Sequence, residues 1–256
     1  MREAIRKRLL VIFGLLLLLG LVAFGARNRI AESIVRSRLS ARGFTCAALT
    51  LELNATFQQV RIVELSCGSP GVIAQLDLPQ PAVIDFEGFR AAQMDFPAVR
   101  LVLEAARTRR AEAGSGMLSR LDMRRRIVPL LRALRAPSIQ ALPPLNIERL
   151  VLVRADREIL VEGLSLQPTE TGQRITIPYV RLDSGLWASA PPEILDATAE
   201  IDDEVTFRGN LVAPVGPLRL SWSFVVSAAM TDSELADIHY EFTPNHLEGT
   251  VDPSAL

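Results

Sequence analysis

The two histidines are the residues best suited to acid–base or metal chemistry, and they lie close together near the C-terminus. His239 and His246 have Asp237 and Glu241 as acidic neighbours. A strand would place His239 and Glu241 on one face, where they could share a metal ion. A third ligand at fixed spacing is missing, and Pro244 interrupts the strand. We therefore interpret both histidines as surface residues and expect no metal site.

Other catalytic patterns are also missing from the sequence. Ser115 and Ser184 each precede a glycine, but neither lies in the Gly-x-Ser-x-Gly motif of a nucleophile elbow. Asp202 and Asp203 are neighbours that a turn would expose to water, and no glycine-rich phosphate loop follows a strand. The net charge of −1 argues against a nucleic-acid partner. We expect a protein that is not an enzyme and carries no cofactor.

The two cysteines are placed where a disulfide could form. Cys46 and Cys67 bracket two strand-like runs, residues 49–53 and 60–65. If these runs pair as a hairpin, their outer ends meet, and a disulfide there would stabilise the fold by about 3 kcal/mol. The alternative is a pair of buried free thiols. We favour the disulfide, and hence an oxidising, periplasm-like compartment.

Residues 9–26 form an uncharged apolar run with basic residues on both sides. As a helix this run would extend about 27 Å, close to the thickness of a hydrocarbon core. The alternative is a cleaved signal peptide, because the small residues 23–25 offer a possible cleavage site. We favour residues 1–26 as a cytoplasmic tip and uncleaved single-pass anchor in an inner membrane, with the remainder in the periplasm.

A juxtamembrane amphipathic helix is expected over residues 27–44. Ile30, Ile34, Val35 and Leu39 recur at helical spacing among arginines, and Gly43 is placed to end the helix.

Residues 45–256 read as one β domain. Residues 218–226 alternate apolar and polar side chains, as do residues 99–103, 205–211 and 238–243, and Pro, Gly and Asp residues separate the runs. Strands and helices do not alternate along the chain, so parallel pairing of the strands is not expected. The sequence therefore predicts a mainly β fold with roughly twelve to fourteen strands in a mainly antiparallel sheet.

Residues 104–136 interrupt this pattern with a basic helical insertion. Leucines and an isoleucine make one apolar side, and the arginines around them include Arg120, Arg124, Arg125, Arg126 and Arg132. Such a helix can pack its leucines on the sheet and leave its arginines in water. It can also cap an apolar groove or lie on anionic lipid headgroups.

The apolar faces of the strands carry the only functional signal. Each such face must be covered by another sheet, a helix or a ligand. Two interpretations stay open: an ordinary sandwich core, or an open concave sheet that holds acyl chains. The candidate residues for lining such a groove are Phe207, Leu218, Leu220, Trp222, Phe224, Val226 and Tyr240.

Several short motifs resemble the AsmA-like family of envelope proteins. They are LPPLNIERLVL at residues 142–152, GLSL at 163–166 and FRGNL at 207–211, with weaker copies at 60–65 and 96–103. Together with the N-terminal anchor and the early cysteine pair, they are most similar to the amino-terminal part of the YdbH branch. The resemblance implies an antiparallel, curved, groove-forming, taco-like β-sheet, hydrophobic inside, that carries phospholipid between inner and outer membranes.

The chain is short for such a role, because fourteen strands would make a groove of roughly 65 Å at most. It would then need a larger envelope protein as a partner, or share only the fold module. We expect membrane lipid as the main ligand. The alternative is a structural or assembly subunit of an envelope or secretion complex, whose β domain binds protein.

Overall fold

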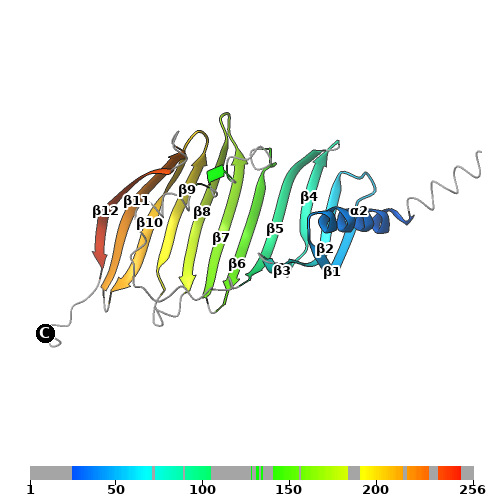
Figure 1. Ribbon diagram of the computed structural model, residues 1–256, viewed down its shortest axis with the longest axis horizontal. Coiled ribbons are helices and arrows are strands. Elements are labelled where there is room, and N and C mark those ends of the chain that lie inside the picture. Colours follow the sequence, from blue (N-terminus) through cyan, green and yellow to red (C-terminus); the bar gives the residue numbers. More distant parts are fainter. Residues whose placement is uncertain are drawn as a thin grey trace, which may run out of the picture.

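The computed structural model describes residues 25–70, 73–88, 90–104, 128, 131–132, 134, 141–155, 157–183, 191–215, 218–230 and 236–248 (Figure 1). Most of the apolar run 9–26 therefore lies outside the described residues, and so do Arg120, Arg124, Arg125 and Arg126 of the basic insertion. Within the described ranges, no helix is both long and apolar enough to cross a bilayer.

Among the described residues, one helix precedes twelve strands. The helix α2 spans Arg27–Ala41. The strands are β1 (Thr45–Leu53), β2 (Gln59–Ser69), β3 (Ile73–Asp77), β4 (Ala82–Glu87), β5 (Arg90–Leu103), β6 (Leu145–Arg154), β7 (Arg157–Pro168), β8 (Gln173–Asp183), β9 (Glu193–Ile201), β10 (Val205–Val215), β11 (Leu218–Met230) and β12 (Ala236–Glu248).

All twelve strands belong to one curved sheet, which confirms the predicted mainly β fold (Figure 1). The order is β1-β2-β3-β5-β6-β7-β8-β9-β10-β11-β12, so strands that follow one another in sequence are usually neighbours in space. The short strand β4 lies off this path and pairs with β2 and β5, as β3 does. Hence β3 and β4 together fill one strand position.

One strand pair departs from the predicted antiparallel arrangement. β5 and β6 are parallel, whereas the other pairs are antiparallel. Parallel neighbours require a connection that returns the chain from the end of one strand to the start of the next. Here that connection is residues 104–144, which include the basic insertion. The parallel pair was not predicted, because the helical pattern of the insertion looked like an interruption between antiparallel strands.

The helix α2 ends where the sequence predicted. Gly43 has φ +84°, a left-handed conformation that glycine adopts readily, and its N–H donates to the carbonyl of Ser40 at 2.9 Å. β1 then begins at Thr45 and contacts the helix, which lies at the β1 end of the sheet (Figure 1).

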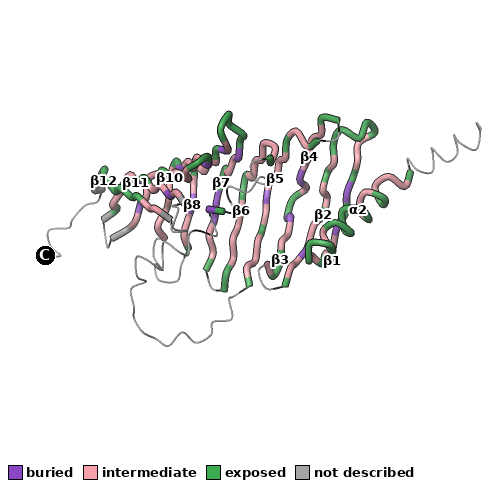
Figure 2. The backbone as a smooth tube through the Cα atoms, turned by 45° about the horizontal axis from the view of Figure 1, so that its top comes forward, coloured by how far each residue is buried: buried purple, intermediate pink, exposed green. Residues whose placement is uncertain are grey.

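Most residues of the sheet are partly buried, and fully buried ones are scattered along its length (Figure 2). One small buried cluster joins the insertion to the sheet. Val128 and Leu131 of the helical insertion pack with Ala228 of β11, and Val205 and Ile238 lie against them. The insertion therefore reaches from the β5–β6 connection to the strands β10–β12.

Candidate functional site

One face of the sheet is apolar from its first strand to its last. Residues that are hydrogen-bonding or facing partners in neighbouring strands point to the same side of a sheet, so a chain of such partners traces one face. The longest chain of partners, here called the first apolar line, contains Leu53, Val60, Ile84, Met94, Leu145, Leu166, Ile175, Ala199, Phe207, Val226 and Tyr240. It crosses from β1 to β12 without a polar residue.

A second apolar line runs beside the first from β5 to β12. Its members are Val99, Leu150, Val161, Val180, Ile194, Leu211, Trp222 and Pro244. We call the side of the sheet that carries both lines the apolar face. It includes two strand partners of the predicted groove residue Val226, namely Phe207 and Tyr240.

The two lines are five residues apart in β5–β9 but four apart in β10–β12. Each of the five strands therefore has one extra residue between the lines, as in a β-bulge, which bends a strand and increases its twist. Gly163 of β7 is at this position with φ +73°, and Asp196 of β9 has φ +50°. The bulge keeps the apolar side chains on one face although strict alternation would have reversed them.

The opposite face, here called the polar face, carries many more polar side chains, although the buried Leu160 and Val212 also lie on it. A line of partners on that side contains Asp95, Asn146, Ser165, Thr176, Thr198, Arg208, Val225 and Glu241. Side chains there bond across strands, as between Asn146 Nδ2 and Asp95 Oδ1 at 2.8 Å. This contrast between the faces indicates that water meets one side, while the other calls for an apolar cover.

Aromatic rings gather on the apolar face at β10–β12. The ring centroids of Phe207 and Phe224 are 5.2 Å apart, those of Phe224 and Phe242 are 6.2 Å apart, and Tyr240 continues the row. Phe224 faces Gly209, where an added Cβ would stand 3.0 Å from the ring. Phe224 is buried, whereas Tyr240 and Phe242 are 58% and 54% exposed.

The structure describes the side chains of all the predicted groove residues except Leu218. Leu220 and Trp222 are partly buried on the same face as Phe224 and Val226. Leu218 pairs with Val215 at the start of β11, and its side chain lies outside the described set. Of the predicted arginines, Arg132 is exposed next to the buried Leu131.

The helix α2 covers the free edge of β1 with polar side chains. Asn28 Oδ1 accepts from the backbone N–H of Leu53 at 3.0 Å, and Glu32 Oε1 accepts from that of Leu51 at 2.9 Å. One turn further, Arg36 Nη1 donates to the carbonyl of Cys46 at 2.8 Å. These three side chains replace the hydrogen bonds that another strand would make.

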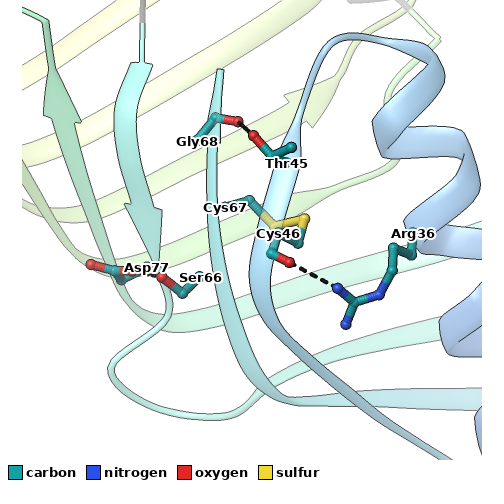
Figure 3. The surroundings of a disulfide bond; sticks show 7 residues. All are labelled: Arg36, Thr45, Cys46, Ser66, Cys67, Gly68 and Asp77. Atoms are coloured by element: carbon teal, nitrogen blue, oxygen red, sulfur yellow. Dashed lines mark hydrogen bonds between the residues drawn. A yellow bond between two sulfur atoms is a disulfide. The ribbon is translucent and has the colours of Figure 1, made fainter. Parts of the chain in front are cut away.

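The predicted disulfide is confirmed. Cys46 of β1 and Cys67 of β2 are direct strand partners and are bonded to each other (Figure 3). Around them, Thr45 Oγ1 donates to the carbonyl of Gly68, and Ser66 Oγ donates to Asp77 Oδ1 of β3 at 2.7 Å. The disulfide thus joins the first two strands near the edge that α2 covers.

One close contact joins a histidine to an acidic side chain near the C-terminal end of the described residues. His239 Nε2 lies 3.3 Å from Asp237 Oδ2, and the histidine side chain is 78% exposed. Among the described residues, no three His, Cys, Asp or Glu side chains are close enough together to hold a metal ion.

Tyr179 on the polar face has a raised pKa. Burial raises the pKa of Tyr179 above its ordinary value, and the hydrogen bond from its hydroxyl to Glu193 Oε1, 2.8 Å long, acts in the same direction. Glu193 also pairs with Arg219 of β11. This network links β8, β9 and β11 across the polar face.

Comparisons with known proteins returned no relatives: no family model matches the chain, and neither the curated proteins nor the solved structures include a match.

Proposed function

We propose that this chain is a periplasmic β-sheet protein, anchored in the inner membrane, that binds phospholipid on its apolar face and helps transfer it across the envelope. The observation that carries the proposal is the first apolar line, an uninterrupted row from Leu53 to Tyr240. A single sheet with one apolar face and no second sheet among its described strands leaves that face for helices and ligands.

The shape and chemistry of the face suit acyl chains. Branched aliphatic residues and phenylalanines line it over the whole width of the sheet, so a chain could slide along it without crossing a polar barrier. Eleven strand positions at about 4.8 Å give a path of roughly 50 Å. The resemblance of several short motifs to those of AsmA-like envelope proteins supports the same kind of ligand.

A matched pair of variants tests the proposal. The full chain is purified in mild detergent, loaded with a phospholipid that carries a photo-reactive acyl chain, and irradiated. Trp222→Asp places a charge on the apolar face, and Val225→Asp places the same charge on the polar face of the same strand, where Val225 is 38% exposed. We expect Trp222→Asp to lose most of the cross-linked lipid and Val225→Asp to keep it. Absence of lipid from the wild type, or equal loss in both variants, would contradict the proposal.

A second candidate function is protein binding, in which the chain serves as an assembly subunit of an envelope or secretion complex. It is favoured by β12, whose outer edge pairs with no described strand and whose Tyr240 and Phe242 are more than half exposed. A photo-reactive amino acid at position 242 distinguishes the candidates in cells. Cross-links to one discrete protein, with no lipid captured by the wild type in the preceding experiment, would support the assembly role.

A further inference from the structure

The helix α2 is amphipathic in an unexpected sense, because its polar side faces the protein. Asn28, Glu32 and Arg36 follow one another at intervals of four residues and bond to the backbone of β1. Its isoleucines point the other way: Ile30 is 50% exposed and Ile34 is 57% exposed, and no residue of the helix is buried. The three polar side chains form the hydrogen bonds with the backbone of β1. Packing of the helix on β1 therefore does not explain why isoleucines occupy its other side.

The surroundings of these isoleucines are strongly basic. Besides the edge-bonding arginine, the helix contains Arg27, Arg29 and Arg38, and its C-cap residue is Arg42. Glu32 is the only acidic residue of the helix. Exposed isoleucines flanked by arginines are characteristic of helices that lie in the interface of an anionic bilayer.

The chain before the helix points to the same partner. The apolar run of residues 9–26 ends at Ala26, and α2 begins at the next residue, Arg27. A bilayer that received this run would therefore meet α2 before any strand of the sheet.

We propose that α2 docks on the surface of an anionic lipid bilayer, with Ile30 and Ile34 inserted at the boundary between headgroups and acyl chains. This inference rests on the proposed membrane anchor but not on lipid transfer by the sheet. It gives one helix two different sides: the polar side closes the edge of β1, and the apolar side holds that edge at the membrane. The first apolar line would then begin next to the bilayer.

The disulfide makes a clean labelling experiment possible. Because the chain has two cysteines and they are bonded to each other, a cysteine introduced elsewhere is the single reactive thiol. The full chain carrying Ile34→Cys is labelled with an environment-sensitive fluorophore and reconstituted in vesicles of phosphatidylcholine with or without phosphatidylglycerol. Spin-labelled lipids then quench any fluorophore in the interface. Thr171→Cys, in the exposed turn before β8, is the matched control.

We expect quenching at position 34 to exceed that at position 171 by at least about twofold, and to increase with phosphatidylglycerol. Adding Ile30→Gln to the labelled variant should reduce the quenching. Flotation of the same samples on a density gradient reports the anchor separately. Floating protein with equal quenching at both positions would overturn the docking of α2 alone, whereas protein that does not float would overturn both the docking and the anchor.

Discussion

Asn28 Oδ1 accepts a hydrogen bond from the backbone N–H of Leu53, and this contact brings the helix α2 to the first residue of the first apolar line. The Asn28 side chain therefore connects the helix that covers the edge of β1 to the strand residue at which the first apolar line begins. An unpaired edge strand is a template for aggregation, and side-chain acceptors are one way to protect it.

The edge contacts should contribute measurably to stability. We expect the double variant Asn28→Ala/Glu32→Ala to lower the free energy of unfolding by about 1–3 kcal/mol, because each change leaves a partly buried N–H without its acceptor. Urea unfolding of the full chain in detergent measures the loss. Ser33→Ala, an exposed change in the same helix, serves as the control and should stay near the wild type. Equal stability of all three proteins would show that water replaces these contacts at no cost.

The disulfide should act on stability through the hairpin that it closes. The bond joins residues 21 apart, so replacing both cysteines with serine should cost about 3 kcal/mol. A reducing agent should lower the melting temperature of the wild type to that of the Cys46→Ser/Cys67→Ser variant and leave the variant unchanged. A wild type insensitive to reductant under unfolding conditions would contradict this expectation.

The alternation of apolar and polar residues was enough to predict a β sheet with two different faces. The two strand-like runs between Cys46 and Cys67 were enough to predict a hairpin closed by a disulfide. Both depend on local sequence. The parallel pairing of β5 with β6 could not be predicted, because it depends on where residues 104–144 lead the chain. The orientation of α2 was also missed. Helical spacing identified its isoleucines, but the need of β1 for hydrogen-bond acceptors decides which side of the helix meets the sheet.

The extra residue between the two apolar lines in β5–β9 could not be predicted from the alternation of apolar and polar residues. A substitution at Gly163 tests this bulge. Its φ of +73° is strained for other residues, and a Cβ would stand 3.1 Å from Cγ of Pro178. We expect Gly163→Ala to lower the free energy of unfolding by about 1–3 kcal/mol. Gly88→Ala is the control for conformation alone, since it has φ +63° but nothing within 4 Å of the added atom. The cost at Gly163 should exceed that at Gly88, and the reverse order would count against the bulge contact.

The raised pKa of Tyr179 predicts a loss of stability in alkali. A phenol that holds its proton more tightly in the folded state than in the unfolded state favours folding below its ordinary pKa of 10.0. That contribution disappears as the pH rises through the pKa of the folded state. Thermal unfolding at about pH 8 and about pH 11 should therefore show a smaller alkaline decrease for Tyr179→Phe than for the wild type. Tyr240→Phe, the change at the other tyrosine, should retain the decrease of the wild type.

The last prediction separates the residues that support the apolar face from those that line it. Phe224 is buried between the rings of Phe207 and Phe242 and against Gly209. Phe224→Ala would leave a cavity there, and we expect it to lower the free energy of unfolding by about 3–5 kcal/mol.

Trp222 is only partly buried, so Trp222→Ala should cost distinctly less stability than Phe224→Ala. If acyl chains lie on the apolar face, Trp222→Ala should still reduce photo-cross-linked phospholipid, because it removes a large apolar contact surface. Urea unfolding and lipid cross-linking on the same preparations measure both effects. A variant that loses stability as Phe224→Ala does, with unchanged lipid capture, would place Trp222 in a packed core and remove it from the proposed binding surface.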